Sequence, residues 1–145
     1  MATPVVIPES ALDGPRAAWL YATNVLGDRF PAGEPVIAQD PEWAYLYAHH
    51  MIQARWPEAE AAIAQDTHWA YWYAREVVQG RFALAEPIII QNPEYAYRYA
   101  MYVLNTRFLE AEPVIAQDTY YSKQYFRNFQ DEFTEHERLI WLLRK

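Results

Sequence analysis

Carboxylate and imidazole side chains are the groups in this sequence that could do chemistry, and their spacing does not predict a catalytic site. The chain has 19 Asp and Glu, four His and no Cys, which excludes disulfides, thiol catalysis and thiolate metal sites. His49 and His50 are adjacent, so on a helix their rings diverge by about 100° and are poorly placed to share one metal ion. Gly-rich phosphate loops, G-x-S-x-G and H-E-x-x-H are absent. We expect a protein that is not an enzyme and uses no cofactor or metal.

An arginine and a glutamate recur together along the chain. The glutamate follows the arginine by five residues, and successive pairs are 26 residues apart. Such charges could contact a ligand, or they could form a ladder of ion pairs or carbonyl contacts that ties adjacent corners of the fold together. We favour the ladder, because a residue needed once per repeat usually has a structural role. The pairs are Arg29 and Glu34, Arg55 and Glu60, Arg81 and Glu86, and Arg107 and Glu112.

The residues around these pairs repeat too. An aromatic residue follows each arginine, and an Ile and then a Gln followed by Asp or Asn come after each glutamate. Self-similarity at a period between 20 and 50 residues indicates a solenoid. We therefore expect one domain, 1–145, with a divergent first repeat or cap at 1–28. The repeats span 29–54, 55–80, 81–106 and 107–132, and a C-terminal helix spans 133–145.

Each repeat is expected to contain a short helix and a longer one. Asp40, Asp66, Asn92 and Asp118 are followed by Pro or Thr, a pattern that predicts helix starts. The longer helix should run for about 13 residues, and Gly80 suits a left-handed helix end. No segment has the sustained alternation of a half-buried strand. The predicted fold is an all-α solenoid of short helix–turn–helix repeats.

Rings and alanines alternate on one face of each longer helix. In the first full repeat Trp43, Ala44, Tyr47 and Ala48 fall within one arc at 100° per residue. A ring of one repeat can lie over the alanine of the next, so the pile of repeats becomes the core. Tyrosines on the flank of this arc are expected to form a partly buried stack between repeats rather than a ligand platform. They are Tyr45, Tyr71 and Tyr97.

Positions that differ between the copies carry the functional information. On the far arc of the longer helices, apolar and aromatic residues appear where purely structural surface would be polar, and Trp, Tyr, Met and Arg are typical of protein-binding patches. Single exposed apolar residues are also common and need no function. The candidate partner-binding residues are Leu46, His49, His50, Trp72, Arg75, Arg98, Met101, Tyr102 and Trp141.

Both ends of the array resemble caps. The apolar segment Val5–Ile7 could cover the open face of the first repeat. Thr134 and Glu137 form a capping-box pattern before a terminal helix. This helix is apolar almost all round, so one face could pack on the array while the other meets a partner or a second copy of the chain.

The net charge of −7 argues against direct nucleic-acid binding, which needs a basic face. No run of about 18 apolar residues predicts a membrane span. The N-terminus lacks a basic region and a long apolar stretch, so we expect no secretory signal.

The pattern R-[FW]-x-x-A-E-P-x-I-A-x-D-P-x-[YW]-A-Y-x-Y-A resembles tandem short repeats in proteins of bacteriophage and large-virus genomes. It covers 29–48, 55–74 and 81–100, and more loosely 107–126, where Lys123 and Phe126 replace Tyr and Ala. The resemblance transfers no catalytic residue. It implies a virus-encoded, non-enzymatic interaction protein that acts on a host or viral complex in the cytoplasm of an infected cell.

Three functions follow as hypotheses. The first is a protein-binding module, an inhibitor or adaptor that acts through the variable face. The second is an acidic decoy that blocks a basic nucleic-acid channel of a host defence complex. The third is a self-assembling structural component, with the C-terminal helix as a possible contact between copies.

Overall fold

Asp or Asn caps start the long helices of the array, as the sequence predicts. In the computed structural model, which describes residues 4–144, the Asp40 and Asp66 carboxylates accept the backbone N–H groups of Trp43 and Trp69 at 3.1 and 3.0 Å. Asn92 and Asp118 cap in the same way. The long helices begin as α1 (Pro15–Tyr21), α3 (Pro41–Tyr47), α5 (Thr67–Trp72), α7 (Pro93–Tyr99) and α9 (Thr119–Phe129).

The first four long helices widen from α to π geometry in their second halves, a feature the sequence analysis did not predict. Each π segment is followed by a left-handed residue: Gly27, Gln53, Gln79 or Asn105, with φ between 55° and 63°. The expectation for Gly80 was therefore wrong by one residue, because Gln79 takes the left-handed conformation. The π segments are Ala22–Leu26, Ala48–Ile52, Tyr73–Val78 and Ala100–Leu104.

Short helices connect the long ones and bury one isoleucine each. Proline at the start of each short helix sets the backbone angle and needs no hydrogen-bond acceptor there. The isoleucines at positions 37, 63, 89 and 115 are fully buried. These helices are α2 (Glu34–Ile37), α4 (Pro57–Ile63), α6 (Glu86–Ile89) and α8 (Glu112–Ile115), with 3₁₀ turns at Ala83–Ala85 and Leu109–Ala111 before the last two.

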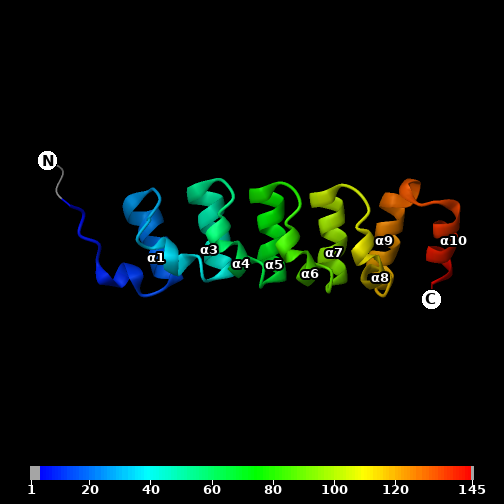
Figure 1. Cartoon of the computed structure of the whole chain (residues 1–145), viewed down its shortest axis with the longest axis horizontal. Coiled ribbons are helices and arrows are strands. Elements are labelled where there is room, and N and C mark those ends of the chain that lie inside the picture. The colour runs from blue at the N-terminus through cyan, green and yellow to red at the C-terminus, as the bar shows by residue number, and fades with distance from the viewer. Residues whose placement is uncertain (1–3, 145) are drawn as a thin grey trace.

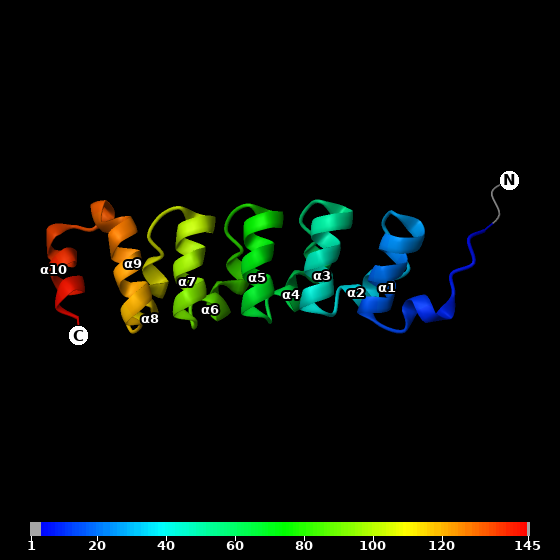
Figure 2. The ribbon, with the colours of Figure 1, turned by 180° about the vertical axis from the view of Figure 1, so that it is seen from behind.

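The repeats form a single row. The long helices stand side by side, the short helices line one edge, and the two termini lie at opposite ends (Figures 1 and 2). Between residues 4 and 144 there is no β-strand. The all-α solenoid is thus confirmed. Within the same range, no helix combines the length and apolar character needed to cross a membrane.

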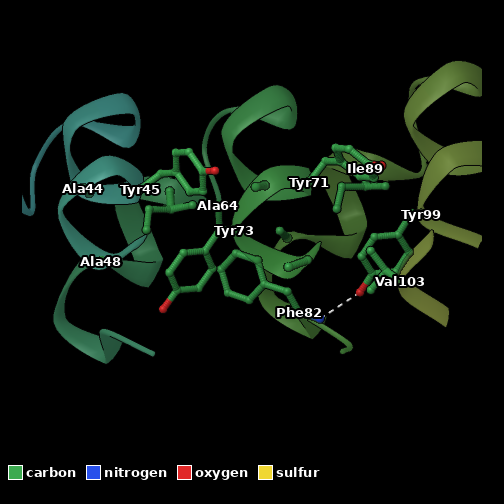
Figure 3. Close-up of a cluster of buried hydrophobic side chains, with 14 of the residues drawn as sticks. Ala44, Tyr45, Ala48, Ala64, Tyr71, Tyr73, Phe82, Ile89, Tyr99 and Val103 are labelled. Atoms are coloured by element: carbon green, nitrogen blue, oxygen red, sulfur yellow. Dashed lines mark hydrogen bonds between the residues drawn. The ribbon is translucent and has the colours of Figure 1, made fainter. Parts of the chain in front are cut away.

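Two layers of ring contacts join successive repeats. In the inner layer Tyr73 packs on Phe82 of the next repeat, with ring centroids 5.1 Å apart (Figure 3). In the outer layer Tyr45 lies on Trp69 at 5.5 Å and Tyr71 on Tyr95 at 5.6 Å, so the predicted tyrosine stack between repeats is confirmed. Alanines at 44, 70 and 96 are completely buried among these rings, and their small size allows close approach of the helices.

The C-terminal cap supplies the ring that a further repeat would have supplied. A 3₁₀ turn, Gln130–Glu132, leads into α10 (Glu135–Leu143), and the predicted capping box of Thr134 and Glu137 forms. The Trp141 ring stacks on Tyr125 at 5.4 Å and meets Phe133 edge-on at 5.4 Å. Trp141 is therefore buried, which corrects its assignment to a partner-binding surface. Other apolar side chains of α10 stay exposed, among them Leu139 and Leu143.

The N-terminal segment does not cover the first repeat. The 3₁₀ turn Glu9–Leu12 packs on the array through the buried Ala11. Val5 and Val6, which precede it, are 71% and 86% exposed, and the chain leaves the α1 end and points away from the row (Figure 1). The expected covering role of Val5–Ile7 is therefore wrong for the described residues of that segment. Residues 1–3 of the predicted N-terminal cap and Lys145 of the predicted terminal helix lie outside the described residues.

Candidate partner-binding face

One hydrogen-bonded network recurs in the four full repeats. In the second, the Arg55 guanidinium holds both carboxylate oxygens of Glu60 at 2.8 Å, a bidentate geometry that orients both groups. The Tyr73 hydroxyl donates to Glu60 Oε1 at 2.9 Å and accepts the backbone N–H of Trp56 at 2.7 Å. The other copies use Arg29, Phe30, Glu34 and Tyr47; Arg81, Phe82, Glu86 and Tyr99; and Arg107, Phe108, Glu112 and Tyr125.

This network ties the start of each repeat to its own long helix. Glu60 follows Arg55 by five residues and Tyr73 follows Glu60 by 13, so all the partners belong to one repeat. The prediction of a ladder between adjacent corners is corrected on this point, because rings rather than charges join neighbouring repeats. The repeated charges are used inside the fold, which leaves recognition to other positions.

Burial fixes the protonation states within the network. It is the largest cause that raises the pKa of Tyr47, to about 12, and it raises the pKa of Tyr73, Tyr99 and Tyr125 as well. The hydrogen bond from Arg55 lowers the pKa of Glu60. At neutral pH the phenols are therefore protonated donors and Glu60 is an ionised acceptor.

The last copy of the network continues into the C-terminal cap. Arg107 Nη1 donates to Glu137 Oε2 at 3.0 Å and to the Glu132 carbonyl oxygen at 3.2 Å. Its guanidinium carbon lies 3.8 Å from the centre of the Phe133 ring. The Arg107 side chain is 10% exposed, against 56% for the equivalent Arg81. These contacts fix α10 to the array.

Residues that vary between the copies line a groove on the long-helix face together with tyrosines of repeated positions, among them Tyr71 and Tyr97. We call it the Tyr–Arg groove. It has a volume of about 450 Å³ and draws its residues from the last three repeats. None of its side chains belongs to the arginine–glutamate–tyrosine network. It is lined by Tyr71, Arg75, Tyr97, Arg98, Tyr102, Tyr120 and Tyr121.

Arg75, one of the two cations of the Tyr–Arg groove, is held by two rings, a hydroxyl group and a carboxylate. Its guanidinium carbon lies 5.3 Å from the Trp72 ring centre and 5.0 Å from that of Tyr102, within the range of cation–π attraction. Nη1 donates to the Tyr71 hydroxyl at 3.2 Å, and Nε pairs with Glu76 at 3.1 Å. The side chain is still 38% exposed, so a positioned guanidinium faces solvent between two rings.

Arg98 and two tyrosines complete the far side of the groove. Arg98 pairs with Glu94 at 2.6 Å and lies 5.9 Å from the centre of the Tyr95 ring. Tyr120 and Tyr121 meet edge to face at 5.0 Å. Three of the predicted residues, Trp72, Arg75 and Tyr102, therefore form one cluster, and Arg98 lines the same groove.

The predicted histidines belong to a different depression. His49 and His50 line a groove of about 420 Å³ together with Glu76 and Gln79. The His49 ring stacks on Tyr45 at 5.7 Å. Burial, with a smaller effect of the neighbouring His49 charge, lowers the pKa of His50, so at neutral pH this ring carries no charge.

Leu46 and Met101 line neither groove. Both are half-buried and pack against the core, so they support the face rather than form it. Conversely, Tyr120 and Tyr121 line the Tyr–Arg groove but were not among the predicted binding residues. The available signal was the pair of adjacent tyrosines in the last copy, where earlier copies place a charged residue or histidine before the ring.

Among residues 4–144, no group of three or more His, Asp or Glu side chains is arranged to hold a metal ion. Comparison of the chain with protein-family models, curated proteins and solved structures finds no match.

Proposed function

We propose that the protein is a non-catalytic binding module that recognises another protein through the Tyr–Arg groove and the adjoining Trp72 ring. The observation that carries this proposal is the position of Arg75, held between Trp72 and Tyr102 while it remains open to solvent. A guanidinium already fixed by rings loses little further freedom when a partner binds.

The composition of the groove supports a protein partner rather than a small metabolite. Trp, Tyr and Arg are the residues that most often dominate binding energy at protein interfaces. The tyrosines of the groove combine aromatic rings with hydroxyl groups, which suits a mixed apolar and polar surface. Following the viral resemblance, we propose an inhibitor or adaptor that acts on a host complex in the cytoplasm of an infected cell.

Charge placement favours this function over an acidic decoy. A nucleic-acid mimic needs exposed and unpaired carboxylates in a row. Here the glutamates of the repeats are paired with arginines, and Asp40, Asp66 and Asp118 accept backbone N–H groups at helix starts. The periodic part of the negative charge is therefore engaged within the fold.

The test is capture of a partner from host lysate, followed by measurement of its affinity with the double variant R75E/Y102E. We expect binding at least about 100-fold weaker than wild type, because two hot-spot side chains are lost. The matched control is R16E/L84E, which makes the same charge change and removes an exposed apolar residue elsewhere. It should bind like wild type.

Circular dichroism should be the same for all three proteins, since the substituted side chains lie outside the core. Wild-type affinity in a folded R75E/Y102E variant would contradict the proposed face. A complex that weakens steeply as NaCl is raised, with little effect of R75E/Y102E, would instead favour the decoy.

A further inference from the structure

A further groove lies at the C-terminal end of the array, apart from the Tyr–Arg groove. This end groove has a volume of about 880 Å³ and runs between α8, α9 and α10. Its apolar wall includes Phe126 and the exposed Leu142; Trp141 lines it too, but its ring is buried against Tyr125 and Phe133. A phenylalanine ring and a leucine facing a groove of this size are suited to an apolar peptide.

The rim of the end groove is positively charged in a protein of net charge −7. Lys123, Arg127 and Arg144 line it, and no carboxylate is found among its lining residues. All three cations are exposed, and within residues 4–144 none of them forms an ion pair. The groove therefore favours an occupant that is apolar and carries negative charge.

The opposite end of the same chain has a segment with these properties. Val5, Val6 and Ile7 are exposed between two prolines, and Pro8 has extended backbone angles, φ −65° and ψ 137°. The prolines stiffen the segment, which lowers the entropy lost on binding. Glu9 and Asp13, which follow, are exposed and complement the cationic rim.

The segment cannot reach the end groove of its own chain. The turn at Glu9 is fixed at the α1 end, and residues 4–8 span at most about 18 Å when extended. The five long helices of the row, at about 8–10 Å per step, place the groove roughly 32–40 Å away. Figures 1 and 2 show the segment and α10 at opposite ends of the row.

From this complementarity we infer that the N-terminal segment of one copy, Pro4–Asp13, docks in the end groove of a second copy. The valines and isoleucine lie against Phe126 and Leu142, and Glu9 and Asp13 pair with the cations of the rim. Such a contact uses different surfaces on the two copies, so it is head-to-tail and leads to open chains rather than a closed dimer. It leaves the Tyr–Arg groove free on every copy.

Sedimentation equilibrium from micromolar to millimolar concentration tests the contact. The wild-type average mass should rise with concentration to at least twice the 17.1 kDa of one chain. V5D/V6D and K123E/R127E should each stay at the mass of one chain. V25D, which changes an equally exposed valine outside the segment, should associate like wild type, and so should R75E/Y102E.

A mixing experiment separates head-to-tail contact from other modes. V5D/V6D has an intact groove and K123E/R127E an intact segment, so an equimolar mixture should form a pair of chains and stop there. The charge-swapped variant E9K/D13K/K123E/R127E should associate again by itself. A pair in the mixture, together with recovery in the swapped variant, supports the inference.

A labelled peptide of residues 1–13 provides a direct measurement on V5D/V6D protein, whose groove is intact. We expect saturable binding that weakens at least tenfold when the peptide carries V5D/V6D or the protein also carries K123E/R127E. A wild-type protein that remains one chain at millimolar concentration, or a peptide that binds both grooves equally, would overturn the inference.

Discussion

Tyr73 joins a carboxylate and a backbone amide through one oxygen atom, and its counterparts do the same in the other full repeats. The hydroxyl bonds to Glu60 and Trp56 are both buried. A buried donor or acceptor left without a partner costs about 1–3 kcal/mol. The side chain therefore acts as a hydrogen-bonding centre as well as a ring in the inner layer.

Removing this hydroxyl should destabilise the fold. For Tyr73→Phe we expect a loss of about 1–3 kcal/mol in the free energy of unfolding, because the Trp56 amide and one Glu60 oxygen lose a buried partner. Urea unfolding followed by circular dichroism measures it. Tyr102→Phe is the control, since this side chain is exposed and should change stability little. Equal effects of the two substitutions would contradict the assigned role.

The contact between Glu137 and Arg107 should make stability depend on acid pH. Hydrogen bonds from Arg107 and then from the Thr134 amide lower the pKa of Glu137 from its ordinary value of 4.5 to about 2. A depressed carboxyl pKa contributes stability that is fully present above about pH 4.5 and is lost as pH falls toward 2. Between pH 5 and pH 3, wild type should therefore lose more stability than E137Q.

Urea midpoints measured at both pH values check this expectation. At pH 7 E137Q should be the less stable protein, and the difference should shrink at pH 3. An E137Q variant with the same pH dependence as wild type would show that this carboxylate does not couple α10 to the array. Because Glu60 also has a lowered pKa, some acid sensitivity should remain in both proteins.

Residue identity predicted that the arginines and glutamates form pairs, but not that each pair lies within one repeat. Because both residues recur every 26 positions, the sequence does not show whether Glu60 pairs with Arg55 of its own repeat or with the arginine of a neighbouring repeat. In the structure Glu60 pairs with Arg55 of its own repeat and also accepts a hydrogen bond from the Tyr73 hydroxyl of the long helix, 13 residues further on. Trp141 was misassigned for a related reason, because its partner Tyr125 lies on another element.

At the scale of the element, the first four long helices depart from regular α geometry beside small buried residues. The π segments in the middle repeats begin at or next to Ala48, Ala74 and Ala100, all fully buried. In the last repeat Phe126 occupies this position and α9 stays α-helical to Phe129. An alanine at this position thus coincides with a π segment, and Phe126 at the same position coincides with the end of the array.

The left-handed residues that end these helices provide a prediction. Gln53 has φ 56°, a conformation that costs roughly 1–2 kcal/mol for a residue with a Cβ and little for glycine. Gln53→Gly should therefore raise the free energy of unfolding by about 0.5–1 kcal/mol, after allowance for the greater freedom of the unfolded chain. Gln39→Gly, at an exposed position with ordinary negative φ, should lower it. Thermal unfolding of both variants measures these changes. If Gln53→Gly does not raise the stability, the backbone at Gln53 is not strained.

Helix starts were predictable and helix ends were less so. Asp40 and Asp66 indicate where a helix begins, because their side chains accept backbone N–H groups of its first turn. The helix end at Gln79 has no such signal. Glutamine is not favoured in the left-handed region, whereas glycine is, so the sequence pointed to the neighbouring Gly80. The π geometry in the second halves of the long helices was likewise not predicted from the helical spacing of the sequence.

For the whole molecule, the 26-residue period of the sequence predicted the architecture. The positions that differ between copies predicted part of the binding face. Trp72, Arg75 and Tyr102 were identified as a set, but the sequence could not show that His49 and His50 lie in a separate depression. The grouping depends on which side chains of neighbouring repeats line the same groove. Likewise, the sequence did not show that the N-terminal segment is exposed at one end of the row and that a groove lies at the other end.

The central claim is that each repeat is an equivalent unit of the stack and that the non-repeating side chains serve recognition. Deletion of residues 55–80 tests it, because Tyr47 then meets Phe82 in place of Trp56, another ring at the same position of the repeat. Urea unfolding of the deleted chain should remain one cooperative transition with native-like helical circular dichroism. Its m-value should fall by roughly one fifth, since one of five stacked units is removed. A chain without a cooperative transition, or one with the circular dichroism of a coil, would contradict the claim.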